Sequence, residues 1–470
     1  FGIIDYVFDR TLYTIEAEVL CNILDLVPSL NIANMYLDEL LYQGVKYGLD
    51  KTNIDITVTK EDFANISLTT EIPALKDIVR ATKELLDEKD IITLNDVKTF
   101  FNNKDYNKEA FYDVETGTIL EKVVTAAADL ETLQVLLPKA LNYGVDKVTK
   151  YDLGFLKNEF SQDELAADLK AVAQLIVPAI NAEMIGLVFG KNLNDLVLHF
   201  EIYPEMLDAV QDMNILNKKY AQFVALGVNE GLKAVQIDKS VQASEFEGIT
   251  FKQELSSLKE VINGIEMLAS SKGYHTVGGV RDAINAKVYQ TVAFYDTEVG
   301  ASLEKVLDSA ADLETVKVLL PKALNYGVDK ITKLDLSFLK NEFSKEELAE
   351  DVKVLAKLVT PLIEAELVKV LFKGNLDEIT LQYGIYQEML DVVQNMNILN
   401  KKYANFIVMA TNYGLDKVNS KQEVTIDMFD NIQFANEVVI LKDVISSIAN
   451  LTDGLNAYTI GSVKDLSLIH

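Results

Sequence analysis

The sequence predicts a mainly α-helical protein, a tandem array of three-helix modules of about 90 residues, joined by short β-like connectors and stacked into an elongated rod. Three observations lead to this prediction. A long internal repeat runs through the chain, apolar residues recur at helical spacing, and only short polar connectors separate the helical patterns.

The repeat is the strongest feature of the sequence. Residues 135–147 read VLLPKALNYGVDK and recur unchanged at 318–330, an offset of 183 residues that continues without a gap on both sides. The octapeptide at 214–221 likewise recurs at 397–404. Such self-similarity is typical of proteins built from repeated structural units.

Two kinds of module alternate within each 183-residue copy. A-type modules are predicted at 110–195 and 293–378, and B-type modules at 196–292 and 379–470. Residues 1–109 are predicted to be a partial copy that ends in a B-type module. From this register we expect the chain to be a segment of a longer array, continued past the last B-type module.

A glycine follows the second apolar segment of each module, at alternating spacings of 96 and 87 residues. Glycine tolerates the left-handed conformation that commonly ends a helix, so these positions are predicted to be structural C-caps. The five glycines are Gly48, Gly144, Gly231, Gly327 and Gly414.

The three helices of a module are predicted from apolar spacing and from cap residues. The first helix is expected around 120–124 in an A-type module and around 205–210 in a B-type module. Asp129 is the expected N-cap of the second helix, and Pro138 is expected to kink it. Ser161 and Glu164 fit a capping box at the start of the third helix.

Prolines are also expected to shape the third helix, and the connectors differ between module types. Pro178 and Pro361 lie at equivalent places and should kink or end that helix. Alternating apolar residues at 54–59 predict a small two-stranded element in B-type modules. The corresponding A-type segment, 152–156, is expected to form a short helical turn.

Composition narrows the classes of partner. The formal net charge of −28 argues against nucleic acid and anionic membrane surfaces as partners, because both attract basic patches. The longest apolar stretch, 171–190, contains Pro178 and Glu183, which favours a buried helix and no membrane insertion. The single cysteine, Cys21, rules out an internal disulfide framework and is expected to be a small buried apolar residue.

No motif in the sequence predicts catalysis, and no cofactor is expected. The three histidines, His199, His275 and His470, lie far apart, without the spacing of metal ligands. The segment 50–61 has the ends of a calcium-binding EF-hand loop, but Asp55 stands where glycine is needed. Calcium bound outside such a motif stays an open alternative, because an acidic surface attracts divalent cations.

Three polar-rich stretches, at 139–147, 155–160 and 214–221, are identical in both copies, whereas other polar positions differ. One interpretation is a recent duplication. The other is a contact, between modules or between chains, that recurs in every repeat and is anchored by aromatic residues. The candidate interface residues are Tyr143, Phe155, Lys157, Asn158, Phe160, Tyr220, Tyr326, Phe338, Phe343 and Tyr403.

These observations favour a non-enzymatic structural protein, self-associating into an extended extracellular filament or a surface-layer element through repeated module contacts. The composition resembles that of repetitive bacterial surface proteins rich in Ile, Lys, Asn and Asp. Two alternatives stay open. One is a monomeric adhesin stalk or binding scaffold that presents a domain outside this chain, and the other is a cytoplasmic cytoskeletal filament.

Overall fold

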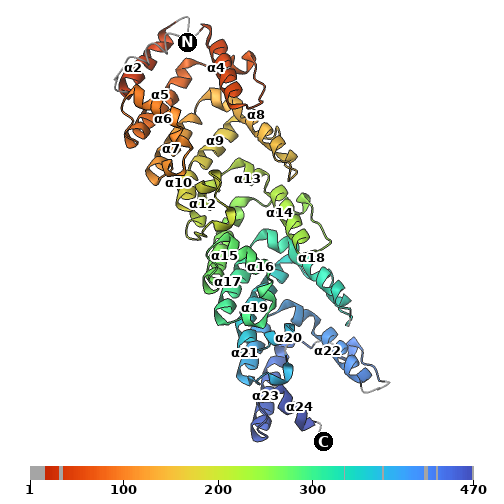
Figure 1. Cartoon of the computed structure of the whole chain (residues 1–470). Helices are drawn as coiled ribbons and strands as arrows, with labels where there is room; N and C mark the ends of the chain where they lie inside the picture. The colour runs from red at the N-terminus through yellow and green to blue at the C-terminus, as the bar shows by residue number, and fades with distance from the viewer. Residues whose placement is uncertain are drawn as a thin grey trace. The chain divides into compact units, whose positions relative to one another are not determined.

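The chain is described by a computed structural model at residues 16–30, 35–332, 334–372, 375–417, 422–429 and 432–467 (Figure 1). It divides into two compact units, 1–255 and 256–470. Each unit is treated by itself below.

The first unit consists of helices and short 3-10 turns, and α15 begins at its end. Helices close in sequence pack on one another: α5 packs on α7, two helices further along, and α8 packs on α9. Its helices are α2 (Ala17–Leu26), α4 (Leu37–Thr52), α5 (Leu68–Glu88), α6 (Leu94–Asn103), α7 (Val114–Ala127), α8 (Glu131–Lys147), α9 (Gln162–Ala173), α10 (Ile176–Asn181), α11 (Ile185–Val188), α12 (Tyr203–Val210), α13 (Asn214–Lys218) and α14 (Tyr220–Ala234).

The second unit repeats the order of elements that starts at α5 in the first, with one helix, α19, in place of α9 and α10 and one, α22, in place of α13 and α14. Its long helix α19 packs on both α17 and α18, as α9 does on α7 and α8 in the first unit. Its helices are α15 (Phe251–Ser271), α16 (Val277–Asn285), α17 (Thr297–Ala311), α18 (Glu314–Lys330), α19 (Lys345–Glu364), α20 (Val368–Leu371), α21 (Tyr383–Val393), α22 (Asn397–Lys417), α23 (Phe434–Gly454) and α24 (Ile460–Ser467).

The prediction of a mainly α-helical chain is confirmed, but the expected two-stranded element is wrong. Within the described ranges there is no strand, and an isolated bridge joins Thr380 to Thr459. Residues 54–59 have no regular structure. Ile56 and Val58 are half-buried between exposed neighbours, so the alternation reflects one side of an extended segment packed on the protein without a partner strand. The expected helical turn at 152–156 is present as a 3-10 turn, Gly154–Leu156.

The glycine C-cap prediction is also wrong. Gly48, Gly144, Gly231, Gly327 and Gly414 all lie inside helices, before the last residue, and none has a positive φ. After α4, the left-handed residue is Asn53, with φ 54°. The apolar stripe continues past each glycine, so the helix continues too.

The start of the third helix agrees with the sequence. Ser161 and Glu164 form the reciprocal capping box, as do Ser344 and Glu347. Asp129, however, does not cap α8, whose N-cap is Leu130. Its carboxylate instead pairs with Lys170 Nζ at 2.6 Å, an interaction between helices that sequence spacing does not reveal.

The prolines act differently in the two copies. The first copy is interrupted between α9 and α10, just before Pro178, whereas α19 continues through Pro361. Pro138 lies inside α8, which continues past it to Lys147. Cys21 is buried as expected, with 1% of its surface exposed.

Candidate assembly interface

In each unit, a buried cluster joins the A-type segment to the helices that follow it. We call these clusters the junction cores. Two aromatic rings meet edge to face in each, Phe155 with Phe223 and Phe338 with Phe406, at centroid distances of 5.3 and 5.2 Å. The first junction core contains Val145, Leu156, Phe160 and Leu165, with Ile215 and Phe223 packed on them. The second contains Val328, Leu339, Phe343 and Leu348, with Ile398 and Phe406.

A buried carboxylate beside each junction core caps the next helix. Asp168 of α9 accepts hydrogen bonds from the backbone N–H groups of Asn214 and Ile215, at 2.6 and 2.9 Å. These groups belong to the first turn of α13, where N–H donors lack partners within the helix and the helix dipole favours negative charge. Asp168 is 3% exposed, so a side chain from one helix supplies the cap that the next helix lacks.

The same cap recurs in the second unit with nearly the same geometry. Asp351 accepts from the backbone N–H groups of Asn397 and Ile398, again at 2.6 and 2.9 Å. The Asn397 amide also donates to Asp351 at 3.1 Å and to the Glu347 carbonyl at 3.1 Å. Burial raises the pKa of the Asp351 carboxyl, although the hydrogen bonds from Ile398 and Asn397 act in the opposite direction.

Two lysines extend each junction on the solvent side. Lys218 pairs with Glu164, and Lys219 pairs with Glu159 at 2.7 Å. In the second unit Lys401 pairs with Glu347, and Lys402 pairs with Glu342 at 2.6 Å. Lys219 and Lys402 also have the same non-helical backbone, with φ of −114° and −119°. The stretch that is identical in sequence therefore also adopts one conformation and makes one set of contacts.

An asparagine carries the junction on to the following long helix. The Asn217 side chain accepts from the backbone N–H of Lys252, at 3.0 Å, in the first turn of α15. Its amide donates to the carbonyls of Gln211 and Met213. Asn400 makes the equivalent bond to Ala435 N–H at 2.9 Å, at the start of α23.

The predicted interface residues lie at or near these junctions. Phe160 is 7% exposed in the first junction core, and Phe155 is half-buried against it. Tyr220 is half-buried against Phe251, with ring centroids 6.1 Å apart. Their twins Phe343, Phe338 and Tyr403 occupy the same places in the second unit. All of these contacts lie within one unit, and a contact between chains at the same residues stays a prediction.

Asn158 holds a strained turn. Its φ of 57° is left-handed. The Asn158 side-chain oxygen accepts a hydrogen bond from the Asn142 amide at 2.7 Å, and the Asn158 backbone N–H donates to the Asn142 side-chain oxygen at 3.1 Å. Asn341 has φ 58° and makes the equivalent two hydrogen bonds with Asn325, the counterpart of Asn142. Asparagine is one of the few residues that tolerate this conformation, which explains its identity in both copies.

Tyr143 and Lys157 are half-buried, whereas the predicted residue Asn158 beside them is exposed. Lys147 Nζ lies 4.9 Å from the Tyr143 ring centroid, and Lys330 lies 5.1 Å from Tyr326. Lys157 pairs with Asp146.

Four residues that carry the junctions were not among the predicted sites, namely Asp168, Asp351, Asn217 and Asn400. The signal was in the sequence. Asp168 and Asp351 are equivalent and identical, whereas the residues just before them, Ala167 and Glu350, differ. An identical carboxylate within a helix whose exposed neighbours change indicates a buried, partnered side chain.

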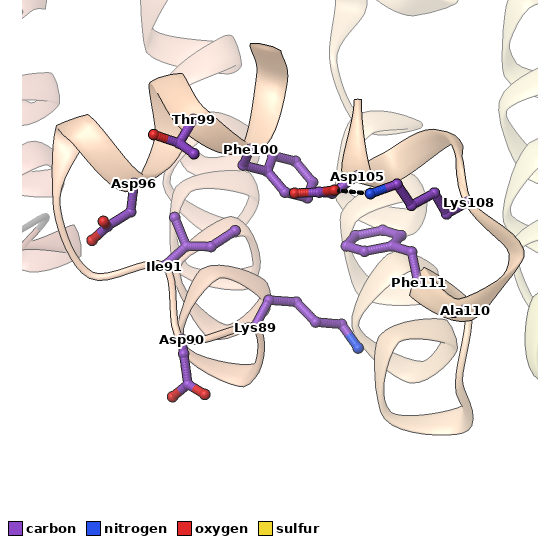
Figure 2. A pocket seen from close by; sticks show the side chains of 10 residues that line it. All are labelled: Lys89, Asp90, Ile91, Asp96, Thr99, Phe100, Asp105, Lys108, Ala110 and Phe111. Atoms are coloured by element: carbon purple, nitrogen blue, oxygen red, sulfur yellow. Dashed lines mark hydrogen bonds and ion pairs between the residues drawn. The ribbon is translucent and has the colours of Figure 1, made fainter. Parts of the chain in front are cut away.

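A hollow of about 400 Å³ lies near the junction of α5, α6 and the turn before α7, and Figure 2 shows its lining side chains. In that view Lys89 extends toward the Phe111 side of the hollow, and Asp105 pairs with Lys108. The lining residues are Lys89, Asp90, Ile91, Asp96, Thr99, Phe100, Asp105, Lys108, Ala110 and Phe111.

The lysine in this hollow has a structural explanation. Lys89 Nζ lies 2.6 Å from Asp113, which caps α7, and 5.4 Å from the Phe111 ring centroid. Lys272 repeats both contacts in the second unit, with Asp296 and Phe294. The other polar lining positions are not repeated, since Gly279, Val288 and Thr291 replace Asp96, Asp105 and Lys108. Both units thus share a lysine that pairs with the N-cap aspartate of a helix and lies over an aromatic ring.

The described residues contain no group of three or more His, Cys, Asp and Glu side chains that could hold a metal ion. His470 lies outside them. Across the same ranges, no helix combines the length and apolarity that crossing a membrane requires. No protein-family model, curated protein or solved structure matches the chain.

Proposed function

We propose that this chain is a non-enzymatic structural protein that self-associates into a filament or surface-layer element through contacts repeated from module to module. The observation that carries the proposal is the recurrence of the junction, bond for bond, at an offset of 183 residues. Asp168 and Asp351 make the same two backbone hydrogen bonds, at 2.6 and 2.9 Å, in both units.

The distribution of sequence identity supports this proposal. The three polar-rich stretches that do not vary between copies all contribute to the joint between an A-type segment and the next helices. In an enzyme, invariant polar residues would be expected to gather at one active site. Here they lie at junctions that occur once in each unit. A role that depends on repetition explains why two copies of a joint are kept alike.

Exposed apolar side chains also support self-association. On α23, Val439, Ile440, Val444 and Leu451 are each between 47% and 69% exposed. Apolar groups gathered on one element are typical of surfaces that meet other proteins. The net charge of −28 opposes non-specific clustering, so contacts would have to be specific.

Sedimentation velocity over a wide concentration series tests the proposal. A structural subunit should shift from a small species to larger ones as concentration rises, with and without calcium. A chain that sediments as one species at every concentration would contradict self-association and favour the monomeric stalk. Dependence on calcium would identify divalent cations as part of the contact.

A further inference from the structure

Helix α23 carries a stripe of apolar side chains that is exposed to solvent. In the two equivalent helices, α5 and α15, another helix covers the corresponding stripe. The stripe consists of the apolar residues Ile440, Val444 and Leu451 together with Ser447, all at helical spacing. Ile440, Val444 and Leu451 are 58%, 47% and 62% exposed. These side chains line an open depression, on the side of α23 opposite to Lys442, which contacts α21.

The opposite side of α23 is fixed by contacts that α5 also makes. Lys442 pairs with Asp391, as Lys76 pairs with Asp25 on α2. Gln387 donates to the Lys442 carbonyl at 3.1 Å, at the position where Cys21 contacts the Lys76 carbonyl. The helices α5 and α23 are therefore equivalent, and their remaining sides can be compared position by position.

In α5, the equivalent stripe is covered by the first helix of an A-type module. The positions of Ile440 and Ser447 are occupied by Ala74 and Ala81, which are 6% and 5% exposed. The helix that packs on α5 is α7, the first helix of residues 110–195. The stripe on α23 thus lacks a cover that its counterpart has.

In α15, the equivalent stripe faces α17, the first helix of residues 293–378. Gly264 stands at the place of Ser447, and a Cβ added to it would lie 3.0 Å from the backbone N of Val306. Glu260 stands at the place of Asp443 and pairs with Lys305 of α17. On α23, Asp443 is exposed beside the stripe and keeps the negative charge that would meet such a lysine.

We propose that the stripe on α23 is a docking surface for the first helix of a further A-type module, in the manner of α17 on α15. The apolar residues Ile440, Val444 and Leu451 pack on the incoming helix, and Asp443 pairs with its lysine. Ile448 is not part of the surface, because its counterpart Ile265 is 42% exposed even where the helix is covered. The inference rests on the proposed function and adds to it the partner element and the residues that receive it.

A helical peptide with the sequence of residues 297–311 is the probe. It is held helical by a hydrocarbon staple on its solvent side, its helicity is verified by circular dichroism, and its binding to the full chain is measured by fluorescence anisotropy. We expect saturable binding that weakens about tenfold or more with the chain variant Val444→Asp, the loss of about 1.4 kcal/mol. The control variant Ile448→Asp should bind as the unaltered chain does.

A charge exchange tests the orientation of docking. A peptide with Lys305→Glu should bind the unaltered chain about threefold more weakly, as expected for one exposed ion pair. The chain variant Asp443→Lys should restore binding of that peptide. Equal binding of both peptides to both chains would overturn the predicted orientation.

Absence of binding by the helical peptide would overturn the proposal. If Val444→Asp abolished association of the chain with itself while the peptide did not bind, the occupant would be a second α23 stripe. A chain that binds the peptide but sediments as one species would retain the docking surface and contradict the proposed function. A chain that self-associates without binding the peptide would support the proposed function and contradict the docking surface.

Discussion

Replacing Asp351 by alanine should loosen the second junction without unfolding the unit. The carboxylate is 2% exposed and accepts from Asn397 N–H at 2.6 Å, Ile398 N–H at 2.9 Å and the Asn397 amide at 3.1 Å. Alanine leaves these donors without an acceptor in a buried place.

The expected cost follows from two contributions. Loss of a cap costs about 1 kcal/mol, and leaving buried donors unpaired costs about 1–3 kcal/mol. Release of the desolvation penalty of the carboxylate, whose pKa burial raises, offsets part of this loss. We therefore expect the opening free energy of the junction to fall by about 3 kcal/mol.

Hydrogen exchange followed by mass spectrometry measures this opening directly. A loss of about 3 kcal/mol should speed exchange of the amides at the start of α22 about 100-fold, since each 1.4 kcal/mol is a factor of ten. The matched control is Glu350→Ala, which places on α19 the alanine found at the equivalent position 167. Glu350 is exposed, and its 3.6 Å pair with Lys353 contributes about 0.5 kcal/mol at most.

Equal exchange in the Asp351→Ala and Glu350→Ala variants would show that the Asp351 carboxylate does not hold the junction closed. The first unit supplies an independent copy of the experiment. Asp168→Ala should speed exchange at Asn214 and Ile215 by a similar factor, because the bond lengths are the same within each pair.

Three further predictions concern stability. Gly327→Ala should raise the free energy of unfolding by about 1 kcal/mol, because the residue is inside α18 with open space around an added Cβ. Gly264→Ala should lower the free energy of unfolding by about 1–2 kcal/mol, because the added Cβ collides with Val306. Urea unfolding measures both changes, and a loss of stability in Gly327→Ala would contradict the helix-interior assignment. Thr116→Val should stabilise the first unit by about 1 kcal/mol, because the buried Thr116 hydroxyl has no hydrogen-bond partner among the described residues and Val299 fills the equivalent place; Val299→Thr should do the opposite in the same assay, and equal stability of both variants would show that the hydroxyl is satisfied. Burial would raise the pKa of Asp113, but hydrogen bonds from Lys89 and from the backbone N–H of Thr116 outweigh it and hold the pKa at about 2. Its stabilisation is therefore present above the ordinary value of 3.8 and is lost as the pH falls toward 2; Asp113→Asn should flatten the decline in unfolding free energy across that window, and an unchanged pH profile would contradict the role of the Lys89 pair.

The sequence predicted the helices and their repetition, because apolar spacing and capping boxes are local signals. Ser161 with Glu164 is such a signal, and the structure has the capping box there. The glycine caps failed because glycine before a polar segment is compatible both with a helix end and with a helix interior. Only the course of the chain after Gly144, which stays helical to Lys147, distinguishes them.

The junctions were only half visible in the sequence. Identity between copies drew attention to the stretches that contain Phe155, Phe160 and Tyr220. Identity also marks Asp168 as unchanged, but it does not reveal the partner of that carboxylate, which lies 46 residues away on another helix. Pairing at such distance depends on how helices pack, which propensity and spacing do not encode.

Negative-stain electron microscopy shows whether copies of the chain assemble through repeated contacts, as the proposed function requires. Purified chain should be imaged at several concentrations, with and without calcium, beside the Val444→Asp variant. Ordered filaments or sheets with a regular repeat are expected at high concentration, and fewer or none with the variant. Separate particles of one size under every condition would contradict the proposed function.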